Sequence, residues 1–307
     1  MTQTRGRDVV GRVCADRVLW AAWAKVAAGS GMPGVDGVSV EMYARRLGAN
    51  LDELRALLRT GRYQSQPVKR LMVGREGKER VLGVPTVRDR VAQRAFLEVL
   101  RRQLEAELSE VSFAYRRGKS WLGALRLAEQ CRDQGLRWVF RGDIASYFDT
   151  ISHQRLRGQL TRLIRDRAAV DIIMQWVSAP ILTDNGLIVP HAGVPQGAPI
   201  SPALANHYLA GLDETINGQH GRLVRYADDL AVFCPDEDAA QAARWDVERA
   251  LATLDLALNP RKSYVSSFDR GFSFLGWVFF RNEGYEESPT SAGWTHPMSV
   301  GRKAGTR

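Results

Sequence analysis

Two adjacent aspartates, Asp228 and Asp229, lie between two runs of strand-forming residues and constrain the fold more than any other feature of the sequence. Residues 224–226 precede the pair and residues 230–233 follow it, so the pattern predicts a tight β-hairpin with both carboxylates at its turn. Carboxylates held close together repel one another unless a cation lies between them. A divalent metal site therefore needs a further carboxylate from elsewhere in the chain, and without one the pair is a solvated turn.

Positive charge is concentrated in one segment. The 307 residues carry a net charge of +9, yet 17 Lys and Arg against 7 Asp and Glu between Arg55 and Arg126 alone give +10. Localised positive charge favours a polyanionic partner, and nucleic acid is the first candidate. A solvated basic face without a partner is the alternative interpretation of the same residues.

The rest of the composition predicts a globular protein that does not cross a membrane. No apolar run approaches a membrane-spanning length, and residues 1–5 lack the apolar core of a signal peptide. The three cysteines, Cys14, Cys131 and Cys234, are far apart, so they give neither a zinc site nor a disulfide framework. They fit a reducing compartment, and we therefore expect a cytoplasmic protein.

Periodicity and turn residues predict alternating helices and short strands. A first helix is marked by Leu19, Trp23 and Val26, and further helices are expected at about residues 40–59, 88–107, 120–134, 154–165, 170–177, 201–212 and 237–256. Strands are expected at about 67–73, 80–84, 138–144, 181–182, 187–189 and 272–280, besides the central hairpin. The strand at 138–144 looks buried and carries Asp143 near its end, which supplies the third carboxylate.

Five motifs follow one another in chain order: residues 141–149 (RGDIASYFD), 193–202 (GVPQGAPISP), 226–229 (YADD), 258–262 (LNPRK) and 274–277 (FLGW). In this order they resemble the motifs of reverse transcriptases, and specifically those of the lineage of bacterial group II introns and the related CRISPR-associated enzymes. Upstream, residues 34–37 (GVDG) and 77–86 (GKERVLGVPT) match the fingers region of that lineage. The resemblance covers about residues 30–280.

The resemblance implies a two-metal site for nucleotidyl transfer. Asp143 and Asp228 would be metal ligands, the backbone carbonyl of Ile144 would complete a metal shell, and Asp229 would be a supporting carboxylate. The implied cofactor is Mg²⁺, as two ions, with Mn²⁺ as a substitute. Lys262 aligns with a lysine proposed to protonate the leaving pyrophosphate, a general-acid role, and a solvated lysine is the alternative.

The resemblance also assigns residues to the substrates. Phe148, five residues after Asp143, matches an aromatic side chain that blocks a ribose 2′-hydroxyl and so favours dNTPs over rNTPs; an ordinary core aromatic is the alternative. Gln196 and Gly197 would contact the incoming nucleotide and the template. The other implied contacts are Lys78 and Arg80 with the triphosphate, Tyr115, Arg116 and Arg117 with the template, and Phe274, Leu275, Gly276 and Trp277 in a primer-grip hairpin.

Together these features predict an α+β, right-hand polymerase fold. Basic, largely helical fingers are expected over residues 1–135, a catalytic palm over 136–280, and a tail or truncated thumb over 281–307. The palm is expected to be an antiparallel sheet with helices on one face. The expected activity is that of an RNA-directed DNA polymerase that acts on an RNA template, a DNA or RNA primer and dNTPs.

Only 27 residues follow the expected last strand, too few for a helical thumb with a maturase domain, for an HNH endonuclease or for a fused integrase. We therefore expect a protein partner that supplies a thumb or integrase function. A stand-alone enzyme of a host system, CRISPR-associated or in phage defence, is favoured over a group II intron-derived enzyme without its maturase domain. Two other classes remain as alternatives: a non-catalytic nucleic-acid-binding scaffold, and an RNA polymerase or template-independent nucleotidyl transferase.

Overall fold

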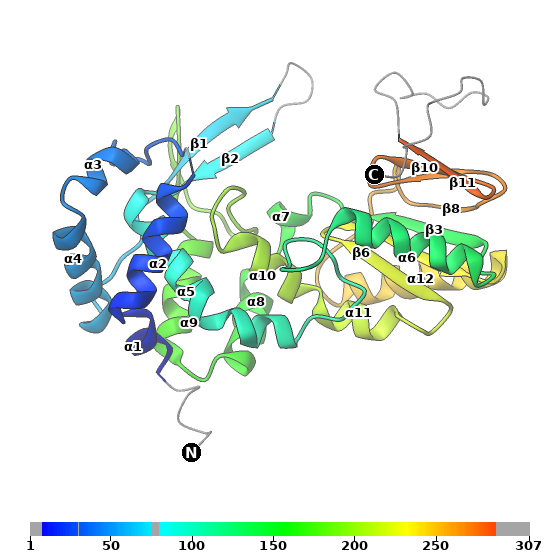
Figure 1. Cartoon of the computed structure of the whole chain (residues 1–307), viewed down its shortest axis with the longest axis horizontal. Helices are drawn as coiled ribbons and strands as arrows, with labels where there is room; N and C mark the ends of the chain where they lie inside the picture. Colours follow the sequence, from blue (N-terminus) through cyan, green and yellow to red (C-terminus); the bar gives the residue numbers. More distant parts are fainter. Residues whose placement is uncertain (1–7, 30, 75–79, 287–307) are drawn as a thin grey trace. The chain divides into compact units, whose positions relative to one another are not determined.

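The structure, a computed structural model, describes residues 8–29, 31–74 and 80–286. The chain divides into two compact units that alternate along the sequence (Figure 1). The first unit combines Met1–Glu107 with Ser146–Tyr208, and the second combines Leu108–Ala145 with Leu209–Arg307. The predicted functional division into residues 1–135, 136–280 and 281–307 stays a prediction. Among the described helices, none combines the length and the apolar character that a membrane crossing requires.

The first unit is mostly helical. Its centre is α5 (Val87–Ala106), which packs against α2 (Asp16–Ala27) and against α1 (Val9–Val13). The other helices are α3 (Val40–Ala44), α4 (Leu47–Arg59), α7 (Tyr147–Thr150), α8 (His153–Leu163), α9 (Arg167–Val177) and α10 (Ser201–Tyr208). The predicted helix at 40–59 is therefore two helices. At the break, the carbonyl of Tyr43 accepts the side-chain N–H of Asn50 in α4 (2.8 Å) and, at the longer distance of 3.4 Å, the backbone N–H of Arg46.

A buried polar network links α5 to α9. The Tyr63 hydroxyl donates to Asp89 (2.6 Å) and accepts a hydrogen bond from the indole N–H of Trp176 (2.7 Å). The other carboxylate oxygen of Asp89, which is only 1% exposed, accepts the backbone N–H of Gln66 (2.9 Å). Each buried polar atom in this chain of contacts has a partner, as a stable core requires.

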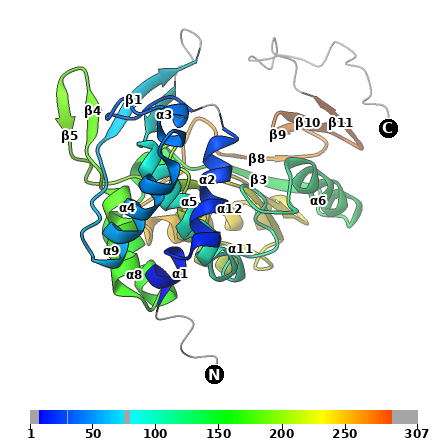
Figure 2. The same ribbon diagram turned by 60° about the vertical axis from the view of Figure 1, so that its left-hand side comes forward.

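A four-stranded sheet completes the first unit, in the order β2-β1-β4-β5. β1 (Val68–Val73) pairs antiparallel with β2 (Arg80–Val84) and parallel with β4 (Ile181–Thr183), and β5 (Gly186–Ile188) pairs antiparallel with β4. Figure 2 shows β4 and β5, in green, beside β1. The predicted strands at 67–73, 80–84, 181–182 and 187–189 are all found in this sheet, and residues 75–79, between β1 and β2, lie outside the described residues.

The second unit is built on an antiparallel sheet in the order β6-β7-β3-β8. Its strands are β6 (Arg222–Tyr226), β7 (Asp229–Cys234), β3 (Trp138–Asp143) and β8 (Tyr264–Ser267). The antiparallel sheet was predicted, but β8 was not. Its four residues include two adjacent serines and are too few to show an alternating pattern, so β8 is recognisable only through its pairing with β3.

Helices cover both faces of this sheet, so the expectation of helices on one face was wrong. Alternate strand residues point to opposite faces, and those on the face of Val139, Ala231 and Phe233 share a core with α6 (Trp121–Asp133). On the opposite face, α11 (Ala210–Ile216) packs against α12 (Glu237–Ala252), which also contacts β3 and β7. Burial runs almost without interruption along β3 and β7, which is typical of strands covered on both sides.

The predicted strand at 272–280 is a hairpin. β9 (Phe272–Phe274) and β10 (Trp277–Phe280) pair through a two-residue loop in which Leu275 (φ 53°) and Gly276 (φ 74°) are both left-handed, as a type I′ turn requires. Leucine at such a position gave no turn signal in the sequence. β11 (Glu283–Glu286) then pairs with β10. The predicted helix at 201–212 is likewise two elements, because Leu209 separates α10 from α11.

The buried cysteines generate a test of the second unit's core. All three thiols are free and buried, and burial raises the pKa of Cys131 to about 11 and of Cys234 to about 12. At pH 8 about 0.1% or less of either thiol is then ionised, so we expect iodoacetamide to label neither in the native protein over an hour. Mass spectrometry should show labelling of all three cysteines in urea. Rapid native labelling of Cys131 or Cys234 would contradict the described core.

Candidate active site

The central hairpin presents one aspartate in its loop and the other in a strand. Tyr226 pairs with Asp229, so the loop consists of Ala227 and Asp228 alone, and Asp229 is the first residue of β7. The expectation that both carboxylates sit at the turn is corrected in this respect. Ala227 adopts a left-handed conformation (φ 58°), which costs a residue with a Cβ atom about 1–2 kcal/mol. The loop that carries Asp228 is therefore held under strain.

The third carboxylate arrives through the pairing of β3 with β7. Asp143, the last residue of β3, lies directly opposite Asp229, so both side chains leave the same face of the sheet. One residue further on, the N–H of Ile144 donates to the carbonyl of Asp228 (3.2 Å). The predicted convergence of Asp143, Asp228 and Asp229 is thus a direct consequence of strand register.

The electrostatics of these carboxylates indicate a shortage of positive charge. Burial raises the pKa of Asp228 above its ordinary value, and the neighbouring charges of Asp143 and Asp229 raise it further. Burial also raises the pKa of Asp229, against the lowering effect of its contact with Arg141. Such mutual repulsion favours the binding of a cation.

Two basic side chains partly compensate this charge. Lys262 lies with its Nζ atom 3.3 Å from Asp143 Oδ1, and its side chain is 64% exposed. Arg141 lies with Nη2 2.7 Å from Asp229 Oδ1, and its side chain is only 10% exposed. The pairing of Lys262 is weak because water screens it, whereas that of Arg141 belongs to the core of the unit.

Arg141 is a residue that the sequence analysis missed as a member of the site. Its guanidinium donates to the carbonyls of Leu230 (2.6 Å) and Ser273 (2.8 Å) and lies 4.4 Å from the ring centre of Phe274. Arg141 thereby ties Asp229 to the β9–β10 hairpin. The available signal was an arginine inside an otherwise apolar strand, which must find a partner because an unpaired buried charge is costly.

The donor chemistry of the site fits a divalent ion that substrate would help to hold. Within 8–29, 31–74 and 80–286, no three His, Cys, Asp or Glu side chains gather closely enough to form a complete metal-binding group. Mg²⁺, however, is commonly held by one or two carboxylates together with waters and substrate phosphates. Asp143 and Asp228 are two such carboxylates, already acting on each other electrostatically. The residues present therefore fit Mg²⁺ without forming a closed cage.

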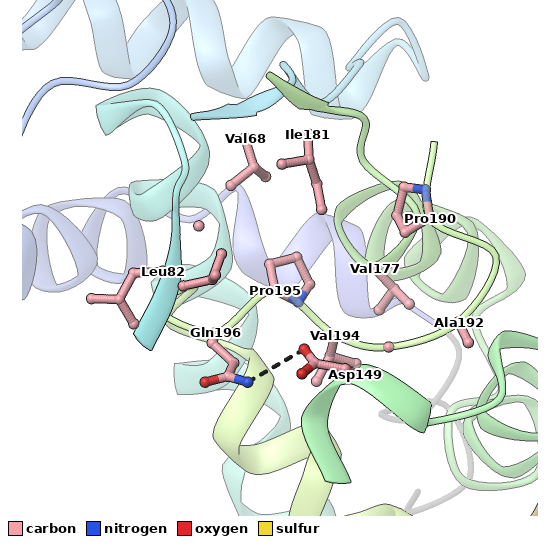
Figure 3. Close-up of a pocket in the computed structure, with 13 residues that line it drawn as sticks. Val68, Leu82, Asp149, Val177, Ile181, Pro190, Ala192, Val194, Pro195 and Gln196 are labelled. Atoms are coloured by element: carbon pink, nitrogen blue, oxygen red, sulfur yellow. Dashed lines mark hydrogen bonds between the residues drawn. The ribbon is translucent and has the colours of Figure 1, made fainter. Parts of the chain in front are cut away.

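The first unit holds the residues assigned to the incoming nucleotide. The Gln196 carbonyl accepts the N–H of Gly83 (2.6 Å), and its side-chain amide donates to Asp149 (3.3 Å) (Figure 3). Gly197 has φ 104°, and a Cβ atom there would lie 2.8 Å from the carbonyl oxygen of Gly83. Only glycine fits this close approach of the loop to β2.

A cavity of about 230 Å³ adjoins this loop (Figure 3). Its walls are mostly apolar and come from β1, β2, β4, the end of α9 and the segment 190–196; Gln196 and Asp149 supply polar groups. Phe148, next to Asp149, is half-buried, and its carbonyl accepts the N–H of Val194 (2.7 Å). The structure thus places Phe148, Asp149 and Gln196 in one neighbourhood.

The other predicted contacts divide into three groups. Lys78 lies outside the described residues, and Arg80 begins β2 with only its backbone described. Arg116 donates to the carbonyls of Ser109 (2.5 Å) and Ser112 (2.8 Å), so its guanidinium holds its own loop. Tyr115 and Arg117 are exposed, and Phe274 to Trp277 span the β9–β10 loop.

Comparison with known proteins gives consistent matches. The model of the family "Reverse transcriptase (RNA-dependent DNA polymerase)" matches residues 69–279. Protein YkfC of Escherichia coli K12 is 32% identical over 294 residues, which cover 82% of this chain and 77% of that protein. The group II intron-encoded protein LtrA of Lactococcus lactis is 34% identical over 161 residues, which cover 52% of this chain and 27% of LtrA. The match thus spans about a quarter of LtrA.

Solved structures show the same relationship. A chain of a partial Cas6-RT-Cas1–Cas2 complex superposes with a TM-score of 0.50 and 26% identity, over 80% of this chain and 41% of that chain. Apo telomerase from Candida tropicalis superposes with a TM-score of 0.58 and 12% identity, over 74% of this chain and 49% of that chain. At that identity the telomerase shows likeness of fold alone.

Replacing Arg141 tests its part in the site. We expect Arg141→Gln to lower the free energy of unfolding by about 2–4 kcal/mol, because it leaves the partly buried carboxylate of Asp229 without its ion pair and frees the β9–β10 hairpin. Urea denaturation followed by circular dichroism measures the change. Arg244→Gln, which removes one partner of an exposed ion pair on α12, should cost no more than about 0.5 kcal/mol. Equal effects of the two substitutions would contradict the structural role of Arg141.

Proposed function

Because the chain belongs to the reverse transcriptase family, we propose that it extends a primer on an RNA template with dNTPs. The predicted resemblance and the predicted right-hand polymerase fold are confirmed by the family match and by the structural neighbours. The observation that carries the proposal is the convergence of Asp143, Asp228 and Asp229 through the pairing of β3 with β7. A non-catalytic scaffold would have no need of three carboxylates that repel one another.

We propose that Asp143 and Asp228, with the backbone carbonyl of Ile144, hold two Mg²⁺ ions. Bound there, the ions would supply activation of the attacking primer hydroxyl and would stabilise negative charge on the departing pyrophosphate. Asp229 adds negative charge beside these ligands while Arg141 fixes its position. Mn²⁺ is the expected substitute, since the same oxygen ligands accept it.

The remaining site residues would bind and orient the substrates. Lys262 carries an exposed ammonium beside Asp143, within reach of solvent, and can donate a proton to pyrophosphate as a general acid. Gln196 and Gly197 bring backbone close to β2. Arg80, and Lys78 two residues earlier in the sequence, are proposed to bind the triphosphate. Phe148 is proposed to exclude the ribose 2′-hydroxyl.

For the biological role, we propose a polymerase module of a cytoplasmic host system, CRISPR-associated or in phage defence, that works with a protein partner. The support is the likeness to a chain of a Cas6-RT-Cas1–Cas2 complex over 80% of this chain at 26% identity. The partner would supply a thumb or an integrase function. The match to LtrA supports the alternative, a group II intron-derived enzyme. The three buried free thiols fit a reducing compartment.

Primer extension tests the site directly. The wild type, given an RNA template, an annealed DNA primer, dNTPs and Mg²⁺, is expected to extend the primer. Asp228→Ala should reduce kcat at least about 100-fold, because it removes a proposed metal ligand. Asp238→Ala makes the same chemical change at an exposed position of α12 and should leave kcat unchanged. No product from the wild type contradicts the polymerase function, and equal rates for wild type and Asp228→Ala contradict the site.

The sugar preference tests Phe148. Phe148→Ala is expected to lower the ratio of dNTP to rNTP incorporation at least about tenfold, because the smaller side chain leaves room for a 2′-hydroxyl. Single-nucleotide incorporation with matched dNTP and rNTP measures the ratio. Trp245→Ala, at an exposed position of α12, should leave it unchanged. An unchanged ratio in Phe148→Ala would show that this side chain is an ordinary core aromatic.

A further inference from the structure

Arg225 is the last residue but one of β6 and binds three oxygen atoms at once. Its Nε and Nη2 atoms each lie 2.6 Å from one of the two carboxylate oxygens of Asp213 in α11, and both side chains are 0% exposed. Its Nη1 atom donates a third hydrogen bond, of 3.1 Å, to the carbonyl of Ala227. The paired contacts with Asp213 satisfy the charge of the buried guanidinium. The third contact reaches into the loop that carries Asp228.

The bond to Ala227 acts on the geometry of Asp228. The carbonyl of Ala227 belongs to the planar peptide group that joins Ala227 to Asp228, so holding this oxygen holds the plane. On the other side of Asp228, its own carbonyl accepts the N–H of Ile144 (3.2 Å). Both peptide planes that flank the Cα atom of Asp228 are therefore anchored. The direction in which its side chain leaves the backbone is restricted as a result.

The conformation of Ala227 shows why an anchor is needed. A two-residue loop with a left-handed first residue usually has glycine there, and alanine adopts this conformation at a cost. Strained backbone of this kind persists only where the surrounding structure determines it. Arg225 is itself fixed on both sides, since its N–H donates to the carbonyl of Val111 and its carbonyl accepts the N–H of Phe113 (both 2.9 Å).

We propose that Arg225, braced by Asp213, is a positioning residue for Asp228. It holds the strained loop so that the Asp228 carboxylate is directed toward Asp143 before any metal ion binds. The proposal rests on the proposed function, because it assigns Arg225 a role toward a proposed metal ligand. The competing role is purely structural: the ion pair would only tie α11 to the sheet, and the contact with Ala227 would have no effect on the site.

A double substitution separates the two roles. Arg225→Met with Asp213→Leu removes both buried charges together and leaves none unpaired, so its urea midpoint should recover most of the loss shown by Asp213→Leu alone. Neither new side chain can bind the Ala227 carbonyl. We therefore expect isothermal titration of the double variant with Mn²⁺ alone to show about tenfold weaker binding than the wild type, with kcat for primer extension lower by a similar factor.

The matched control is Arg244→Met with Glu248→Leu. It likewise replaces an arginine by methionine and its carboxylate partner by leucine, but at an exposed ion pair of α12, with Nε 3.0 Å from Oε1. Its Mn²⁺ affinity should equal that of the wild type. If the buried double variant fails to fold, Arg225→Lys serves instead. It keeps the charge beside Asp213, but a single ammonium cannot replace the planar fork that holds three oxygens, so the Mn²⁺ affinity should again fall.

The outcomes distinguish this proposal from the proposed function. A wild type that extends primers, with a double variant that matches it in Mn²⁺ affinity and in kcat, overturns the positioning role and leaves the polymerase function standing. A wild type that extends no primer, with Mn²⁺ affinity that falls tenfold in the double variant, supports the positioning role and overturns the function. A folded wild type that extends no primer and binds no Mn²⁺, either alone or with dNTP and annealed primer, overturns both.

Discussion

The pairing of β3 with β7 is the constraint on which the rest of the site depends. In this register Asp143 and Asp229 are direct partners, and two residues earlier Arg141 is opposite Ala231. Side chains alternate along a strand, so a shift by one residue would turn Asp143 and Arg141 to the opposite face. Both faces of the sheet are covered, which penalises such a shift. The packing of the core, by fixing this register, therefore also places Asp143 opposite Asp229.

Two arginines hold the acidic hairpin from opposite faces of the sheet. Arg141 lies on the face of Asp143 and Asp229 and connects Asp229 to β9, whereas Arg225 lies on the other face and connects the loop to α11. Each buried charge is costly alone and stable only with its partners. These contacts lie next to the carboxylates and restrict the loop from both faces of the sheet. Among the contacts described, none is a direct ion pair of the Asp228 carboxylate.

Much of this arrangement could be predicted from the sequence because local patterns were consistent with the fold. The strand before Asp143, the Asp228 hairpin and most helices have clear periodicity or turn residues. The roles of Arg141 and Arg225 were not predicted, because their partners, Asp229 and Asp213, are identified only by tertiary packing. The serine-rich strand β8 and the leucine at the β9–β10 turn contradict local propensity and are stable only through tertiary contacts. Periodicity predicts where strands lie, but only the register of the sheet determines which residues are opposite one another.

The alternation of the two units along the chain also affects how the protein is made. The N-terminal half of the second unit, with β3, leaves the ribosome long before β7 and β8, which are its partners on either side. The segment between them includes α7 to α10 of the first unit, so the central sheet depends on contacts between residues that are distant in the sequence, which slow folding. No single cut yields the second unit as a continuous fragment. Isolating it would require the two segments to be joined by a designed linker.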